Sequence, residues 1–282
     1  MRYHKKYKFF ILGSYDQFNM VDDGLLGVMK TSWLGKMAKV YTHPSVVLWR
    51  AIELRQLDRI FSKMKNIPHP ILDLGCGEGE IARALFGKGV IDVGLDNEAE
   101  MVKKAKKSQV YKKVILGDAQ NLSFKKESFN LVFSNCVVEH IPDINKVLKE
   151  AARVLKKNGL FVFTVPSDKF GDYLFFSQFF KKIKIPFLAK LYAIFRNRQL
   201  KHFHCYSQKF WQQKLRKNNF ILIESKNYIN PLTLSFWDWL AFKKKFFPFI
   251  KIPMEKMISY YEKDGQSQQG GAFLLIAKKM GQ

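Results

Sequence analysis

The sequence predicts an α/β protein built on a doubly wound, parallel sheet. Short apolar runs alternate with helix-like stretches between residues 71 and 165. A glycine-rich turn follows the first apolar run, and several later runs end in Asp. Alternation of this kind is typical of parallel sheets, in which ligands bind outside the carboxyl ends of the strands.

The expected elements of this core follow one another in a regular order. The strands are at residues 71–74, 90–96, 113–116, 129–134 and 159–165. The helices are at residues 79–86, 97–107 and 143–157. The last helix carries apolar residues on one face, and Asn158 and Gly159 should end it.

An amphipathic helix is expected over residues 45–64, ahead of the first strand. Its apolar residues recur at helical spacing. Its polar face consists of Arg50, Glu53, Arg55 and Arg59. Trp49 and Arg50 either face a ligand pocket or pack against the core.

Two segments outside this core combine aromatic and basic residues, at 169–200 and 232–250. Residues 169–217 hold twelve Lys and Arg and one acid, Asp172. Such segments suit a helical lid, an interfacial membrane helix or a surface for single-stranded RNA. Burial of the aromatics beneath a solvated lysine face is the remaining interpretation.

Composition narrows the class of protein. The 282 residues carry a formal net charge of +24, which reflects either a functional basic surface or a compositional bias toward Lys. The three cysteines form no CxxC pair, which argues against a disulfide framework and a cysteine-rich zinc site. No uncharged apolar stretch reaches the roughly 18 residues of a spanning helix. We therefore expect a cytoplasmic protein, in peripheral contact with the inner membrane face if it contacts a membrane.

The glycine turn reads Leu-Gly-Cys-Gly-Glu-Gly-Glu over residues 74–80. It departs from the dinucleotide fingerprint G-x-G-x-x-G, because the third glycine is at position 79 instead of 80. Glycines here permit positive φ angles and close approach of a ligand. Asp96 ends the next strand, where an acid can hold ribose hydroxyls.

Taken in order, these motifs resemble those of class I S-adenosylmethionine-dependent methyltransferases, in their methyltransferase-11-like branch. The resemblance rests on residues 71–79, 93–96, 117–119, 129–143 and 154–159. It implies S-adenosyl-L-methionine as cofactor and S-adenosyl-L-homocysteine as product. It also implies a seven-stranded sheet, with residues 220–224 as sixth strand and residues 272–277 as an antiparallel last strand.

The resemblance further implies which residues bind the cofactor. Asp73 would receive its amino group, Asp96 both ribose hydroxyls, and Asp118 the adenine amino group. The glycine turn would pass under methionine and ribose, and Asn135 would lie beside the sulfonium. The expected set is Asp73, Gly75, Cys76, Gly77, Asp96, Asn97, Asp118, Ala119 and Asn135.

The candidate catalytic residues are those expected near the methyl group of the cofactor, where the acceptor of that group would bind. His140 follows the fourth strand and is expected to act as a base or substrate contact, or else to pack structurally. His202 and His204 are the second candidates for this role, and Tyr206 is a candidate for substrate contact. His202 and His204 have the spacing of a metal-binding pair but no third ligand, so no metal site is expected. Cys76 is expected to be structural.

Four segments are expected along the chain. They are a helical cap (1–66), the cofactor-binding core (67–167), a helical lid with a linking helix (168–219), and the rest of the sheet (220–282) with a second insertion at about 231–263.

The expected activity is methyl transfer to a small-molecule, glycan or lipid-linked acceptor, with oxygen favoured as the acceptor atom. Residues 173–196 and 232–250 are candidates for membrane contact. An RNA methyltransferase is an alternative, less favoured because only nine of the 48 basic residues are Arg. A catalytically idle module that binds a partner or membrane is another. No oligomeric state is predicted.

Overall fold

The computed structural model describes residues 32–247, 249, 252–264 and 268–281. Their centre is one seven-stranded sheet, in the order β3-β2-β1-β4-β5-β7-β6. The strands are β1 (Ile71–Leu74), β2 (Ile91–Asp96), β3 (Tyr111–Leu116), β4 (Phe129–Asn135), β5 (Leu155–Pro166), β6 (Phe220–Tyr228) and β7 (Ala272–Lys279). Strands β1 to β5 are parallel, and β7 runs antiparallel to β5 and β6. The predicted doubly wound sheet with an antiparallel last strand is confirmed.

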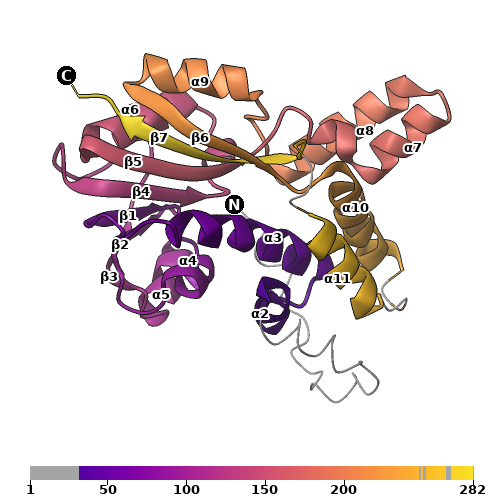
Figure 1. Ribbon diagram of the computed structural model, residues 1–282, viewed down its shortest axis with the longest axis horizontal. Helices are drawn as coiled ribbons and strands as arrows, with labels where there is room; N and C mark the ends of the chain where they lie inside the picture. The colour runs from indigo at the N-terminus through magenta and orange to yellow at the C-terminus, as the bar shows by residue number, and fades with distance from the viewer. Residues whose placement is uncertain (1–31, 248, 250–251, 265–267, 282) are drawn as a thin grey trace.

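Helices cover both faces and one end of the sheet (Figure 1). They are α2 (Trp33–Val40), α3 (Pro44–Phe61), α4 (Glu80–Phe86), α5 (Ala99–Lys107), α6 (Ile144–Val154), α7 (Phe175–Lys182), α8 (Pro186–Leu200), α9 (Gln208–Lys217), α10 (Pro231–Phe246) and α11 (Met254–Lys263). Two short 3-10 turns are η3 (Val138–His140) and η4 (Gly171–Tyr173). Of the expected segments, residues 1–31 of the cap and residues 248, 250 and 251 of the second insertion lie outside the described residues.

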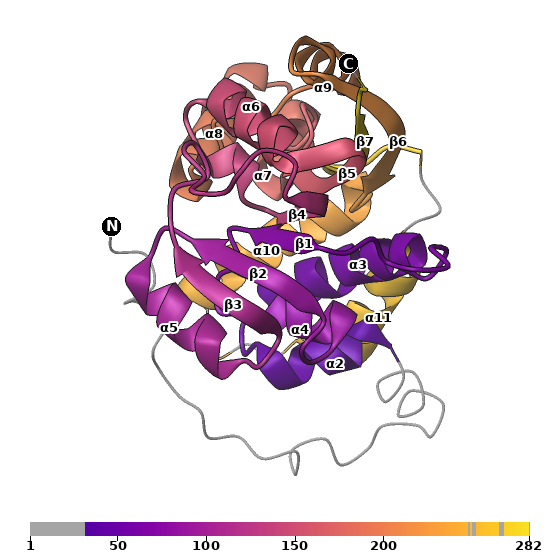
Figure 2. The same cartoon turned by 90° about the vertical axis from the view of Figure 1, so that its left-hand side faces the viewer.

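Strand β7 shows how the sheet separates two apolar cores. Leu274 and Ile276 pack in the core formed with α3, α10 and α11. Phe273 and Leu275 pack in the opposite core, with α6 and α9. The period of two follows from the pleat, which directs successive side chains to opposite faces. Figure 2 shows the same two layers from the side of β3, with α6 and α9 on one face and α3 and α4 on the other.

The boundary between α6 and β5 differs from the predicted one. The helix ends at Val154, and β5 begins at Leu155, so Asn158 and Gly159 lie within the strand. The backbone N–H of Ser128 donates to the Val154 carbonyl at 2.8 Å, and Leu155 pairs with Phe129. These long-range bonds satisfy the last helical carbonyls, which sequence periodicity does not reveal. Asn158 takes a φ of 64° and turns the chain inside β5 instead of capping the helix.

Several strands are longer than predicted, and two of the extensions matter for the site. Strand β3 begins at Tyr111, which pairs with Ile91. Strand β6 continues to Tyr228, which pairs with Ala272. The predicted helix 45–64 instead spans Pro44–Phe61.

Helices α7, α8 and α10 lie beyond the carboxyl ends of β5 and β6 (Figure 1). Helices α7 and α8 pack against each other, and α10 packs against both α7 and α3. Among the described helices, none has the length and apolarity needed to cross a bilayer.

Candidate active site

The glycine turn curls over the end of β2. The backbone N–H groups of Gly75 and Cys76 both donate to the Leu95 carbonyl, at 2.7 and 2.9 Å. Gly75, Gly77 and Gly79 all have positive φ angles, of 78°, 54° and 83°. A Cβ on Gly75 would lie 2.5 Å from the Val137 side chain, whereas a Cβ on Gly77 would meet nothing within 4 Å. The turn is therefore closely packed at Gly75 and open at Gly77.

Asp96 ties the turn to β2. One of its carboxylate oxygens accepts from the Gly77 N–H at 2.8 Å, and the other from the Glu98 N–H at 3.0 Å. The residue is 9% exposed, while Asn97 beside it is exposed. Asp96 thus lies at the open end of the turn, where it can accept from a bound ligand.

Asp73 lies behind the turn, and Tyr111 binds it. The Tyr111 hydroxyl donates to one carboxyl oxygen at 2.7 Å. Burial raises the pKa of Asp73 to about 7; the hydrogen bond from Tyr111 lowers it, and the charge of Asp96 adds to the rise. The Tyr111 ring also covers Gly94, where a Cβ would lie 2.9 Å from it. A contact from Asp73 to a ligand ammonium therefore shares this carboxyl with Tyr111, a partner that the sequence analysis missed.

The remaining adenine-side candidates follow β3. Asp118 is exposed and accepts from the Gln120 N–H at 2.8 Å, which forms a local turn. Ala119 is 7% exposed and packs in the core with Leu122.

Cys76, in the glycine turn, is 8% exposed. Burial together with the Asp73 and Asp96 charges raises the pKa of its thiol, so the thiol stays protonated.

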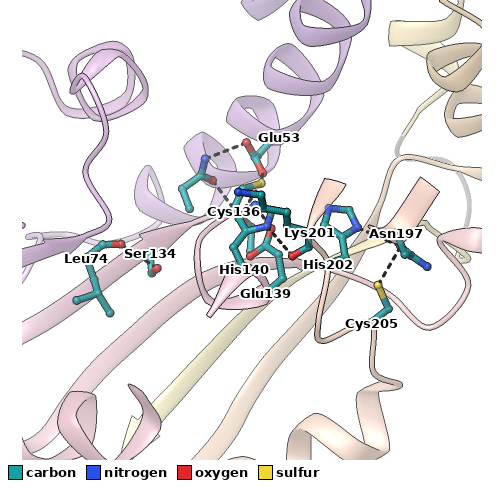
Figure 3. Close-up of polar contacts among 12 residues, drawn as sticks. Glu53, Leu74, Ser134, Cys136, Glu139, His140, Asn197, Lys201, His202 and Cys205 are labelled. Atoms are coloured by element: carbon teal, nitrogen blue, oxygen red, sulfur yellow. Dashed lines mark hydrogen bonds and ion pairs between the residues drawn. The ribbon is translucent and has the colours of Figure 1, made fainter. Parts of the chain in front are cut away.

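Asn135 ends β4 in a buried hydrogen-bond network centred on Glu53. Figure 3 shows Glu53 of this network beside Cys136. The Asn135 amide donates to Glu53 at 3.0 Å and accepts from the Thr164 hydroxyl at 3.0 Å. Glu53 also accepts from Arg50 at 2.6 Å, Tyr228 at 2.8 Å and the Cys136 thiol at 2.9 Å. The network joins α3, β4, β5 and β6 around the residue expected beside the sulfonium.

The position of Glu53 corrects the sequence analysis, which placed it on the polar face of its helix. It is 0% exposed. Burial raises its pKa, but the Arg50 charge and the hydrogen bonds from Cys136 and Asn135 outweigh burial, and the net pKa is lowered. Four donors make its burial tolerable: Arg50 on the same helix, and three more at the ends of β4 and β6. The sequence did contain a signal for this burial, because Glu53 lies four positions before Leu57 on an otherwise apolar face of the helix.

On the acceptor side, His140 ends η3 with a side chain that is 40% exposed. Its Nδ1 lies 3.1 Å from the Lys201 carbonyl, and its ring centroid lies 5.5 Å from that of His202. The Glu139 carboxyl lies 3.8 Å from His140 Nε2. The structure thus brings His140 together with His202, one of the second candidates, and with Glu139, which the sequence analysis did not single out.

His204 and Tyr206 are placed differently. His204 is 5% exposed, with Nε2 2.7 Å from the Ile141 carbonyl and Nδ1 3.0 Å from the Tyr206 hydroxyl. The Tyr206 ring packs on Phe210 at 4.2 Å. Because both His204 nitrogens are hydrogen bonded within the protein, neither can take a substrate proton without losing a contact. The geometry favours a structural role for this pair over substrate contact.

Part of the chain is similar to a known protein family and to curated proteins. Residues 72–163 match the family model of a methyltransferase domain. A malonyl-[acyl-carrier protein] O-methyltransferase of Legionella pneumophila is 33% identical over 115 residues, 38% of this chain and 40% of that protein. The ubiquinone/menaquinone biosynthesis C-methyltransferase UbiE of Rickettsia massiliae is 35% identical over 117 residues, 37% of this chain and 47% of that protein. The chain spans less than half the length of these curated relatives.

Solved structures share the fold. A SAM-dependent methyltransferase of Archaeoglobus fulgidus has a TM-score of 0.51 at 17% identity, over 82% of this chain and 94% of that one. The [4+2]-cyclase SpnF has a TM-score of 0.52 at 14% identity, over 80% of each chain. A fold shared with a cyclase does not define a reaction. The family match does define the class: residues 72–163 are a class I S-adenosylmethionine-dependent methyltransferase domain, which confirms the resemblance.

S-adenosylmethionine is the cofactor of this class, and the described residues fit it. The open space at Gly77 admits a ligand against the backbone. The Asp96 carboxylate lies at the same point. The Arg50 guanidinium, 25% exposed and bonded to Glu53, is a cation that would suit the cofactor's carboxylate.

Proposed function

We propose that the whole protein transfers the methyl group of S-adenosylmethionine to a small-molecule, glycan or lipid-linked acceptor. The observation that carries the proposal is the carboxyl edge of the sheet, where the glycine turn, Asp96 and the Asn135–Glu53 network meet. The two relatives named above are an O-methyltransferase and a C-methyltransferase. We propose oxygen as the acceptor atom.

The rate of methyl transfer depends mainly on how the acceptor and the methyl group are positioned. The acceptor attacks the activated methyl, and neutral thioether sulfur leaves. Holding nucleophile and methyl in line can contribute roughly 7–11 kcal/mol. In our proposal Asp73, Asp96 and Asp118 bind the amino group, ribose and adenine, and Asn135 lies at the sulfonium. The four hydrogen bonds to Glu53 keep that end of the site rigid.

Helices α7 and α8 supply the acceptor side with an apolar, basic surface. Exposed apolar residues of this pair and its connecting turn are Phe179, Ile183, Ile185, Phe187, Leu191, Ile194 and Phe195. Exposed lysines alternate with them at positions 181, 182, 184 and 190. Aromatic anchors with lysines are typical of surfaces that bind anionic lipid. We therefore favour a lipid-linked acceptor, presented at a membrane surface.

The surface continues onto α10. Phe176 of α7 contacts Phe242 of α10 at 4.9 Å between ring centroids, and Phe242 contacts Phe246 at 4.5 Å. Leu232 and Phe249 are 68% and 78% exposed. The two predicted membrane-contact segments thus form one continuous surface beside the carboxyl ends of the strands.

The RNA alternative has less support from the geometry. A described pocket of about 480 Å³ is strongly basic. Its lining includes Lys126, Lys149, Arg153, Lys157, Lys217 and Lys279. It lies at the amino ends of β4 and β5, the edge opposite the glycine turn. RNA bound there would not reach the proposed methyl.

Calorimetric titration with S-adenosylmethionine and S-adenosylhomocysteine tests the proposal. We expect micromolar binding by the wild type and loss of binding in Asp96→Ala. Asp172→Asn, an exposed acid that pairs with Lys181, is the matched control and should bind like the wild type. A folded wild type that binds neither compound would refute the proposal. Mass spectrometry of lipid and glycan extracts incubated with labelled cofactor then identifies the acceptor.

A further inference from the structure

Three side chains of metal-ligating type meet beside the proposed methyl end. Glu139 and His140 come from η3, and His202 follows α8. One potential ligand atom from each lies within 4.8 Å of the other two. Figure 3 shows the three side chains grouped beside the Cys136–Glu53 contact. Neither Glu139 nor His202 has a part in the cofactor site described above.

The backbone holds the two contributing segments together. The Phe203 N–H donates to the Glu139 carbonyl at 2.8 Å, although 64 positions separate them (203 − 139). Helix α8 ends at Leu200, and the next residue, Lys201, takes a left-handed φ of 56°. This turn presents the Lys201 carbonyl to His140 and places His202 against the His140 ring. The three side chains therefore sit on a common, hydrogen-bonded frame.

Hydrogen bonds determine which nitrogen of each histidine carries the proton. His140 Nδ1 lies 3.1 Å from the Lys201 carbonyl, and His202 Nδ1 lies 3.2 Å from the Asn197 side-chain oxygen. The Cys205 thiol donates to the same Asn197 oxygen at 3.5 Å, which fixes the orientation of the amide. Oxygen acceptors require N–H at both Nδ1 positions, so both Nε2 atoms keep a lone pair. Histidines that bind metals are held in this way, by a carbonyl on the other nitrogen.

Glu139 has an unsatisfied acceptor at the same place. The residue is 2% exposed, and its Oε2 has no hydrogen-bond partner. Its Oε1 lies 3.8 Å from His140 Nε2. Buried carboxyl oxygens are normally hydrogen bonded or bound to a cation. The Glu139 carboxylate and the two imidazoles together make a three-ligand set.

We propose that Glu139, His140 and His202 bind a divalent transition-metal ion. Two imidazoles and one carboxylate suit Zn²⁺ and its neighbours Co²⁺ and Mn²⁺, whereas Mg²⁺ and Ca²⁺ prefer oxygen ligands. Ligands on one Zn²⁺ tetrahedron lie about 3.3–3.5 Å apart. Side-chain movements on the order of 1 Å would bring the present set to that spacing. Three protein ligands leave a coordination position open, as catalytic sites do.

A metal ion bound here would take part in the proposed methyl transfer, and this role for the metal rests on the proposed function. An acceptor hydroxyl bound at the open position would have a lowered pKa and lose its proton to water. The resulting oxygen anion would form the O–C bond as the C–S bond breaks, and the thioether would keep the electron pair. His140 Nε2 would then bind metal and not act as the general base, because one lone pair cannot do both.

The test is titration of the purified full chain, stripped of metal, with ZnCl₂ by calorimetry and with CoCl₂ by its visible d–d absorption. We expect one equivalent of each to bind the wild type. Glu139→Gln and His140→Asn should each bind at least roughly 10-fold more weakly. His69→Asn removes an exposed histidine that pairs with Asp92 outside the site, and should bind like the wild type. MgCl₂ should show no comparable binding.

Two results would overturn the metal site. One is a folded wild type that binds neither Zn²⁺ nor Co²⁺. The other is Glu139→Gln and His140→Asn binding as tightly as His69→Asn, which would mean adventitious surface binding. If Glu139→Gln fails to fold, as judged by circular dichroism, the comparison of His140→Asn with His69→Asn decides whether the metal site exists, because His140 is partly exposed. Titration with S-adenosylmethionine in the same samples tests the proposed function separately, since metal binding does not require the cofactor.

Discussion

Arg196 of α8 and Asp238 of α10 form a buried ion pair, with Arg196 Nε donating to Asp238 Oδ1 at 2.8 Å. The two residues are 8% and 1% exposed. Asp238 also accepts from the Tyr192 hydroxyl at 2.8 Å and the Phe175 N–H at 3.1 Å. One carboxylate therefore joins α7, α8 and α10, and the two aromatic insertions form one unit.

Removing one partner of this pair should destabilise the protein strongly. Arg196→Met leaves Asp238 buried without its counter-charge, which costs about 3–5 kcal/mol. The exposed pair of Asp172 and Lys181 provides the comparison, because loss of a surface pair costs at most about 1 kcal/mol. Urea unfolding of Arg196→Met and Asp172→Asn measures both. Equal, small losses would show that the buried pair does not hold the insertions together.

Two glycines of the same turn should respond differently to alanine. At Gly75 the added Cβ meets Val137 at 2.5 Å, so Gly75→Ala combines a clash with the left-handed φ. At Gly77 the space is open, and only the left-handed conformation costs energy, about 1–2 kcal/mol. We expect Gly75→Ala to lower the free energy of unfolding more. Gly77→Ala should instead mainly weaken cofactor binding, because its methyl fills the open space.

Urea unfolding and calorimetry on both variants separate these effects. A Gly77→Ala protein that binds S-adenosylmethionine like the wild type would show that the cofactor does not approach the turn at this point.

Local sequence signals predicted the sheet and the glycine turn, whereas partners distant in sequence escaped prediction. The turn is specified within a few residues by positive φ angles and by Asp at the strand ends. Glu53 and Tyr228 bond across 175 positions, and Tyr111 reaches Asp73 across 38. Glu53, Tyr111 and Tyr228 each looked like an ordinary surface or strand residue, because the hydrogen-bond partner of each lies in another element. The H-x-H spacing likewise suggested His204 as the partner of His202, but the fold pairs His202 with His140.

Asp73 should make stability depend on pH. Its folded-state pKa is about 7, above the unfolded value of about 3.9. As pH rises through this window the unfolded chain loses the proton first, so stability falls between about pH 4 and pH 7 and then levels off. The contribution is at most about 4 kcal/mol. Asp73→Asn keeps an acceptor for Tyr111 and should remove this loss.

The measurement is the free energy of urea unfolding from pH 4 to pH 8. Asp92→Asn is the control, since hydrogen bonds from Lys112 and His69 outweigh burial and lower the pKa of Asp92. A lowered carboxyl pKa contributes stability above its unfolded value, so this variant should not abolish the fall between pH 4 and pH 7. Identical slopes in Asp73→Asn and wild type would refute the assignment.

The α7–α8 surface should bind anionic membranes. Phe187 and Leu191 lie on α8 and are 67% and 46% exposed. Burying such a side chain in an interface contributes about 1.5–3 kcal/mol when complete. Phe187→Ser and Leu191→Ser should therefore each weaken binding to phosphatidylglycerol vesicles roughly 10-fold. Ile221→Ser, at a 54% exposed position near the start of edge strand β6, is the matched control and should bind like the wild type.

Vesicle co-sedimentation at two salt concentrations checks the mechanism. Because lysines alternate with the apolar residues, binding to phosphatidylglycerol should weaken as ionic strength rises, while the smaller binding to neutral phosphatidylcholine should not. Equal loss of binding in Ile221→Ser would place the contact elsewhere on the molecule. A wild type that does not sediment with anionic vesicles would leave the exposed α7–α8 residues as a lid over a soluble acceptor, and would exclude the membrane-presented substrate that we favour.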